Sequence, residues 1–195
     1  VWAGTRFMGG TREDRPFDHD ARSLLEVMSS LNLILDISHM REKAALTSLD
    51  SYDGPVMAGH GNCRAVIKGQ GGERQFTDQT LRQLIEHDGV VGILPYNKFL
   101  VPDWNANLQR EAVTLEQVIR HIDHVCQLAG DSKHVGIGSD FDGGFGYPNI
   151  PFEMDTIADL QKLSPALSDQ GYTEQDVQNI FHQNWLNLLE RSMPS

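Results

Sequence analysis

Three short apolar segments of this chain each end on a side chain that can bind a metal ion or move a proton. The first ends on His39, the second on His60 and the third on Asp140. Neutral imidazole binds zinc and similar divalent ions, and two such ligands on adjacent parallel strands can converge on one ion. A carboxylate in such a place can take a proton from a water molecule or give one to a leaving amine. These residue types favour an enzyme, with a metal-assisted site as one interpretation.

Each of these residues also has a purely structural interpretation. The two histidines could be hydrogen-bonded side chains near strand ends, and Asp140 could close an Asx-turn or cap a helix. Asp142 fits such a turn better, because it lies within the turn itself. The spacing alone leaves the metal site and these alternatives open.

Other residues carry weaker signals. His121 and His124 are three positions apart on an expected helix and share its polar side with Arg120, which favours a solvated face. The pair Gly136 and Gly138 follows a strand but lacks the third glycine and the helix start of a dinucleotide-binding motif, so that interpretation is rejected.

An arginine follows the strand that ends on His60. Arg74 lies in a polar loop after that strand, and a planar guanidinium there could hold the carboxylate of a substrate. Taken by itself, Arg74 fits a surface charge better.

The elements that must position these residues alternate between strand and helix. We expect strands at 33–37, 56–58, 90–94 and 135–138, with 1–5 as the tail of a further strand. We expect helices at 18–30, 42–49, from Thr77, from Thr114 to Gly130, at 156–167 and from Thr173. The strands lack polar–apolar alternation, which is typical of parallel strands covered by helices. The fold class is therefore α/β in one domain over residues 1–195, and the pattern leaves both a barrel and an open doubly wound sheet possible.

The clearest helix is the one that begins after Thr114. Thr114 and Gln117 form a capping box, an apolar stripe follows at helical spacing, and Gly130 ends the helix. Thr77 is expected to cap the start of another helix.

Composition excludes some partners. The 195 residues carry a net charge of −11, which argues against binding to nucleic acid or to an anionic membrane. No apolar run is long enough to span a bilayer, and no basic-then-apolar leader opens the sequence. Cys63 and Cys126 form no CxxC motif, so we expect free, packed thiols and a reducing, cytoplasmic compartment.

The motifs around the reactive residues resemble those of the membrane (renal) dipeptidase family, metallopeptidase family M19, among the amidohydrolase-like barrels. They are Asp36-Ile-Ser-His39-Met, Pro55-Val-Met-Ala-Gly-His60-Gly-Asn62-Cys-Arg-Ala-Val66, Val135-Gly-Ile-Gly-Ser-Asp140-Phe-Asp-Gly143 and the terminal Asn184-Trp-Leu. The motifs occur in the family's order, and the resemblance covers essentially the whole chain.

The resemblance implies a (β/α)₈ barrel that holds two zinc ions, bridged by a carboxylate and a water, and hydrolyses dipeptides. His39 and His60 match the histidines that bind one of the zinc ions. Asp140 matches the catalytic aspartate, and Arg74 matches the arginine that holds the substrate carboxylate.

This sequence also departs from the family. The His-x-Asp pair and the bridging glutamate that supply the other zinc ligands are not found in it, which indicates the C-terminal half of the barrel with four to five strand–helix units. The usual Ser-His-Ser around the second histidine is Gly59-His60-Gly61 here, and the lost hydroxyls could loosen the support of that ligand. Trp2 stands where some relatives have a substrate-contacting histidine, a difference between branches of the family.

The resulting hypothesis is a zinc-dependent dipeptidase. The alternatives are a catalytically incomplete fragment or another amidohydrolase-like hydrolase of amides or lactones. A half barrel leaves strand edges and apolar surface uncovered, so a homo-oligomer or a second chain with the N-terminal half is a possible partner.

Overall fold

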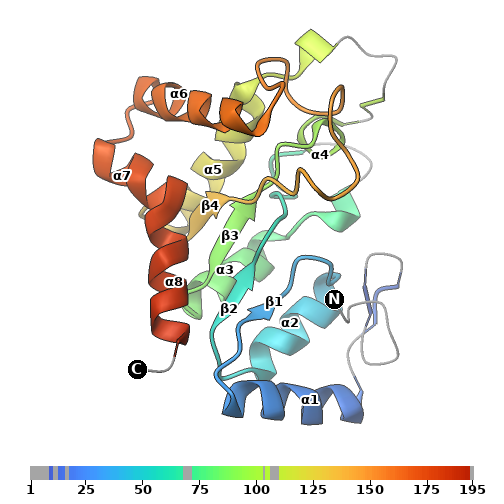
Figure 1. Cartoon of the computed structure of the whole chain (residues 1–195). Helices are drawn as coiled ribbons and strands as arrows, with labels where there is room; N and C mark the ends of the chain where they lie inside the picture. The colour runs from blue at the N-terminus through green and yellow to red at the C-terminus, as the bar shows by residue number, and fades with distance from the viewer. Residues whose placement is uncertain are drawn as a thin grey trace.

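Four parallel strands form one sheet at the centre of this chain (Figure 1). The computed structural model describes residues 9–10, 13–15, 18–67, 72–102, 104–105 and 110–193. The strands are β1 (Leu35–Asp36), β2 (Val56–Ala58), β3 (Val90–Ile93) and β4 (Val135–Ile137). Leu35 pairs with Val56, Met57 with Val90, and Val91 with Val135. The four strands predicted between residues 33 and 138 are therefore present, whereas residues 1–5 lie outside the described residues.

The strands follow one another across the sheet in chain order, β1-β2-β3-β4. A doubly wound sheet reverses its strand order at a switch point, whereas a (β/α) barrel adds each strand beside the previous one. The observed order is that of a barrel segment, and it answers the question that the sequence pattern had left open.

Helices connect and cover the strands. The α-helices are α1 (His19–Ser30), α2 (Glu42–Ser51), α3 (Asp78–Glu86), α4 (Asn97–Leu100), α5 (Leu115–Ala129), α6 (Leu163–Asp169), α7 (Glu174–Gln178) and α8 (Asn184–Ser192). Short 3₁₀ turns cover Gly72–Arg74, Arg110–Ala112 and Ile157–Lys162, and a π-helical segment covers Asn179–Gln183. The helix predicted at 156–167 is therefore half 3₁₀ turn, and the last predicted helix contains a π segment.

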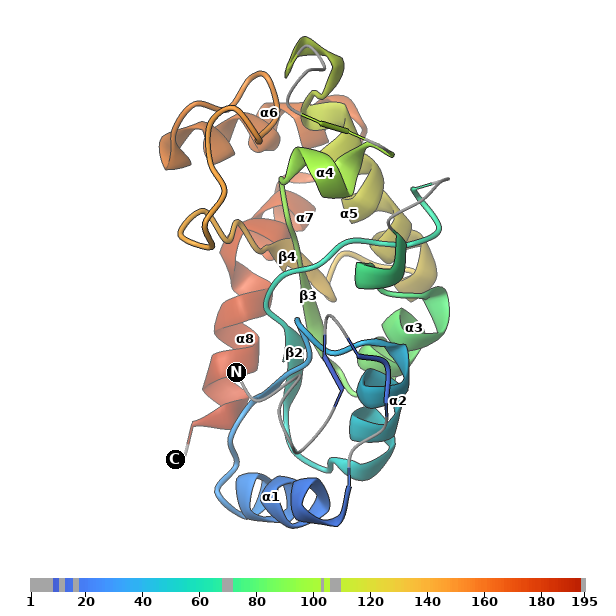
Figure 2. The ribbon, with the colours of Figure 1, turned by 90° about the vertical axis from the view of Figure 1, so that its right-hand side faces the viewer.

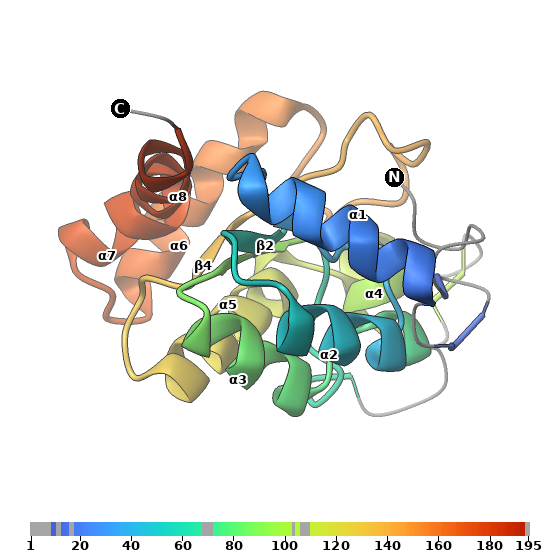
Figure 3. The ribbon, with the colours of Figure 1, turned by 90° about the horizontal axis from the view of Figure 1, so that it is seen from below.

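The helices α2, α3 and α5 lie side by side as one layer, and α8 lies across the sheet from them (Figures 2 and 3). All four residues of β3 are buried, as expected for a central strand covered by helices. Among the described residues, no helix is long and apolar enough to cross a membrane.

The predicted helix ends are confirmed where side chains cap them. Thr114 and Gln117 form the capping box of α5, and Gly130 ends this helix with φ of 80°, a left-handed conformation that favours glycine. The Thr77 hydroxyl accepts a hydrogen bond from the Thr80 amide at the start of α3.

The interpretation of His121 as part of a solvated face is wrong. Its side chain is completely buried, and its Nδ1 accepts a hydrogen bond of 3.1 Å from the backbone amide of Cys63. His124, one turn further along α5, is partly buried and lies 2.8 Å from a carboxylate oxygen of Asp78. The buried face of α5 is thus wider than the apolar stripe predicted from the sequence, because it also includes His121.

Both cysteines are free and buried, as predicted. Burial raises the pKa of Cys126 to about 11 and also raises that of Cys63, so both thiols stay protonated at neutral pH. The cytoplasmic location stays a prediction.

Candidate metal and substrate site

Three of the four predicted site residues follow the carboxyl ends of strands. His39 follows β1, His60 follows β2, and Asp140 follows β4. Because the strands are parallel, these ends meet at one edge of the sheet, where barrel enzymes carry their active sites. Arg74, in the 3₁₀ turn Gly72–Arg74, completes the group.

The side chains of His39, Arg74 and Asp140 all approach the Nε2 atom of His60. His39 Nε2 is 3.2 Å from this atom, and Arg74 Nη2 is 3.3 Å from it. A carboxylate oxygen of Asp140 lies 3.8 Å from the same nitrogen. The fold thus brings together residues that are up to 101 positions apart in the sequence (39 to 140).

The environment of the two histidines favours neutral imidazole. Burial lowers the pKa of His39 below its usual value of 6.5, and the Arg74 guanidinium lowers it further. Burial also lowers the pKa of His60, although the Asp140 carboxylate opposes this shift. Neutral imidazole is the form that binds metal ions.

These side chains fit a metal ion as part of its ligand set. Two imidazole Nε2 atoms that face each other at 3.2 Å can share a proton, or both can direct their lone pairs at one cation. In the part of the chain that the structure describes, no group of three or more His, Cys, Asp or Glu side chains is placed to hold a metal. His39 and His60 can therefore supply two ligands, and a closed site needs further ones.

The backbone at Asp140 is in the left-handed region, with φ of 47°. Aspartate tolerates this conformation better than most residues, and such local strain is common at functional sites. The Gly143 amide donates a 2.8 Å hydrogen bond to the backbone carbonyl of Asp140. A Cβ atom on Gly143 would lie 2.3 Å from the Asp140 carboxylate, so a side chain at position 143 would displace that carboxylate. The turn therefore closes through the backbone and leaves the carboxylate beside His60.

Glycines on two strands allow the His60 loop to approach the sheet. A Cβ atom on either Gly92 or Gly138 would lie 2.3 Å from the carbonyl oxygen of Gly59. The Gly61 amide donates a hydrogen bond of 2.9 Å to the Gly92 carbonyl. Gly138, one of the two glycines rejected as a nucleotide-binding motif, thus serves close packing beside the site.

The sequence did not single out Asn62 as a structural residue of the site. Its side chain is fully buried, donates to the carbonyl oxygens of Leu94 and Phe99, and accepts from the Leu94 amide. These bonds hold the loop after β2 against the end of β3. Its place just after a predicted strand is the signal in the sequence that could have indicated this role.

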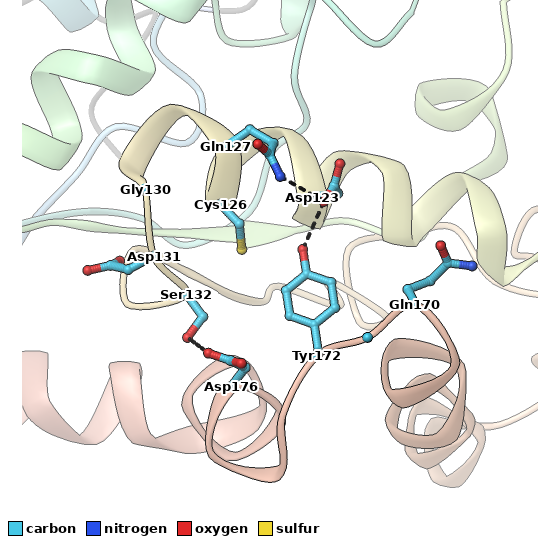
Figure 4. A pocket seen from close by; sticks show the side chains of 10 residues that line it. Asp123, Cys126, Gln127, Gly130, Asp131, Ser132, Gln170, Tyr172 and Asp176 are labelled. Atoms are coloured by element: carbon cyan, nitrogen blue, oxygen red, sulfur yellow. Dashed lines mark hydrogen bonds between the residues drawn. The ribbon is translucent and has the colours of Figure 1, made fainter.

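A separate surface cavity of about 350 Å³ lies near the amino end of β4, away from these residues (Figure 4). Its carboxylates already have partners within the chain. Asp123 accepts a 3.2 Å hydrogen bond from the Tyr172 hydroxyl, and Asp176 accepts a 2.7 Å bond from Ser132. These contacts give the two carboxylates a structural role. None of the four predicted site residues lines this cavity.

Comparisons with known proteins agree with this fold. The model of the membrane dipeptidase family (peptidase family M19) matches residues 11–193. A solved metallo peptidase from Rhodobacter sphaeroides, liganded with a phosphinate mimic of the dipeptide L-Ala-D-Ala, matches with a TM-score of 0.80 and 32% identity, over 95% of this chain and 50% of that one. An amidohydrolase from Pseudomonas aeruginosa shares the fold, with a TM-score of 0.79 at 21% identity over 94% of this chain and 60% of that one.

Curated relatives point the same way. The dipeptidase tcpJ of Claviceps purpurea is 27% identical over 190 residues, which cover 94% of this chain and 41% of that protein. An uncharacterized protein in the pqqA 5' region of Klebsiella pneumoniae is 33% identical over 86% of this chain and 58% of its own length. The chain therefore spans about half the length of the relatives it matches, and the α/β fold of a partial amidohydrolase-like barrel is confirmed.

Proposed function

Because this chain belongs to the membrane dipeptidase family, peptidase family M19, we propose that it is the C-terminal half of a zinc-dependent dipeptidase barrel. The family implies a metal cofactor, and imidazole ligands suit zinc. The observation that carries the proposal is the meeting of His39, His60, Asp140 and Arg74 at the carboxyl edge of the sheet.

His39 and His60 are the residues that would hold the metal ion through their Nε2 atoms. A zinc ion supplies Lewis-acid polarisation of the peptide carbonyl and makes water a stronger acid. Asp140, whose side chain is 28% exposed, accepts the proton of the attacking water and passes it to the leaving amine.

Arg74 binds the free C-terminal carboxylate of the dipeptide. Its Nη1 is buried and has no hydrogen-bond partner among the described residues, an arrangement that a planar carboxylate would satisfy. Its Nη2 lies 3.3 Å from the His60 nitrogen that would bind the metal. If His60 bound a metal ion through this nitrogen, Arg74 Nη2 would also become free to bind the substrate. Selection for a free carboxylate next to the scissile bond restricts hydrolysis to very short peptides.

The remaining ligands must come from outside the described residues. We propose that they are supplied by a further half barrel, either N-terminal sequence of the same protein or a second chain. The proposal also allows an assembly in which the second chain is another copy of this one, a homo-oligomer.

The test is made on the barrel completed with its N-terminal half, and it measures zinc per chain by elemental mass spectrometry and hydrolysis of L-Ala-D-Ala and of its C-terminal amide. We expect bound zinc, hydrolysis of the dipeptide and little hydrolysis of the amide. Asp140→Asn should reduce the hydrolysis rate at least about a hundredfold with zinc content unchanged. The absence of both zinc and hydrolysis would contradict the proposal for this chain, and preferred hydrolysis of a lactone would favour the alternative hydrolase.

A further inference from the structure

Asp36, the last residue of β1, and Ser38 in the loop that follows both contact the loop after β2. Asp36 Oδ1 accepts hydrogen bonds from the Ser38 amide (2.9 Å), the Ser38 hydroxyl (2.5 Å) and the Gly59 amide (3.1 Å). The Ser38 hydroxyl oxygen in turn accepts a 3.0 Å bond from the His60 amide. Two of these four hydrogen bonds connect the end of β1 to the loop after β2, and the other two join Ser38 to Asp36.

These bonds act on the backbone next to both histidines. His39 directly follows Ser38, which is only 3% exposed, so fixing Ser38 fixes the residue from which the His39 side chain departs. The amides of Gly59 and His60 are both held, which fixes the start of the His60 side chain. The distance of 3.2 Å between the two Nε2 atoms depends on both of these positions.

The glycines beside His60 make this support necessary. Gly59 and Gly61 have no side chain that could hold the loop, and glycine has the greatest backbone freedom of any residue. A Cβ atom on Gly59 would lie 2.9 Å from Asp36 Oδ2, so the carboxylate occupies the space that a side chain at position 59 would take. The segment 36–38 thus gives the His60 loop the support that hydroxyl side chains at positions 59 and 61 could have given.

We infer that Asp36 and Ser38 are positioning residues, which hold His39 and His60 in register for a shared metal ion. This inference rests on the proposed metal-dependent function. Outer-shell partners of metal ligands typically change metal affinity ten- to a hundredfold when removed. Neither side chain needs to contact the metal or the substrate for this role.

The first test is made without metal, on the 195-residue chain. Amide hydrogen exchange is measured by NMR for Gly59 and His60 in the unmodified protein, Ser38→Ala, Asp36→Ala and Asp36→Asn. We expect roughly fivefold faster exchange at His60 in Ser38→Ala and at Gly59 in Asp36→Ala, because each loses its acceptor. Asp36→Asn keeps an acceptor oxygen and should exchange as the unmodified protein does. Ser168→Ala, which removes an exposed hydroxyl bonded within α6, is the matched control.

The second test is Co²⁺ affinity, measured on the barrel completed with its N-terminal half and followed by the visible absorption of the bound ion. Ser38→Ala and Asp36→Ala should each weaken binding about tenfold, and Ser168→Ala should leave it unchanged. Unchanged exchange at Gly59 and His60 in folded Ser38→Ala and Asp36→Ala would overturn the inference. If Asp36→Ala does not fold, Ser38→Ala alone decides. If the completed barrel with the unmodified chain binds no Co²⁺ but exchange changes as expected, the positioning contacts stand and the proposed metal function fails.

Discussion

Burial of His121 makes the stability of this chain depend on pH. Burial lowers the pKa of its imidazole to about 3, with a smaller contribution from His124. In the unfolded chain the pKa of histidine is about 6.5, so below that pH the unfolded chain binds a proton that the folded chain excludes. Stability from this residue is therefore complete above about pH 6.5 and is lost as the pH falls towards 3.

We predict that lowering the pH from about 7 to 5 costs roughly 2 kcal/mol of unfolding free energy through His121 alone. His121→Gln should remove this part of the pH dependence, whatever its effect on stability at pH 7. His182→Gln, at an exposed position, should keep the dependence of the unmodified chain. Urea unfolding at the two pH values measures the difference, and equal pH dependence in both variants would contradict the assignment.

Gly61 is required by packing against an aromatic ring. A Cβ atom at this position would lie 2.3 Å from Cε2 of Phe76, a side chain that is 4% exposed. Gly61→Ser, which restores the residue common in the family, should therefore destabilise this chain by about 1–3 kcal/mol. Gly146→Ser is the control, because nothing lies within 4 Å of a Cβ atom there. Comparable unfolding midpoints in urea for the two variants would show that Phe76 moves aside without cost.

At the scale of elements, Arg110 fixes the segment that follows β4. Its guanidinium donates to the carbonyl oxygens of Ile150 (3.1 Å), Pro151 (2.9 Å) and Met154, and it forms a 2.9 Å ion pair with Asp155. The Arg110 side chain is only 14% exposed. A segment without helix or strand is thereby tied to the 3₁₀ turn Arg110–Ala112 before α5.

We predict that Arg110→Gln leaves several of these carbonyl groups without a partner and costs about 1–3 kcal/mol. The segment between residues 141 and 156 should also be cleaved faster by protease. Arg120→Gln is the matched control, because Arg120 is 59% exposed and, in the part of the chain that the structure describes, forms its ion pair with Glu116 one turn away. Limited proteolysis with mass spectrometry locates the cleavage sites. Equal cleavage of the two variants would refute a holding role for Arg110.

At the scale of the whole molecule, both outer strands of the sheet have one neighbour among the described residues. The strand β1 pairs with β2, and β4 pairs with β3. Leu31 and Leu33, just before β1, are 64% and 47% exposed. An open strand beside exposed apolar side chains favours association with another chain.

We predict that the chain self-associates as its concentration rises, and that Leu31→Lys with Leu33→Lys weakens this association. Added lysines next to an edge strand oppose pairing by charge and by loss of apolar surface. The control is Ile157→Lys, which is 65% exposed but lies away from β1. Sedimentation velocity over a range of concentrations measures the effect. A monomer at all concentrations would contradict the prediction.

The sequence by itself determined the local structure and the types of the reactive residues. The strands at β2 and β4, the capping box at Thr114 and the helix end at Gly130 depend on neighbouring residues, so their patterns are visible in the chain. The prediction that His39 and His60 lie together also held, because parallel strands bring their carboxyl ends to one edge.

Only the tertiary structure decided which polar groups are buried and which loops hold one another. His121 could not be placed from its helix position, because its partner at Cys63 is 58 residues away. The bonds of Asp36 and Ser38 to the His60 loop depend on strand register and on the exact approach of two loops. Periodicity reports which side of an element is buried, but it does not report contacts between elements, and the support of the site is made of such contacts.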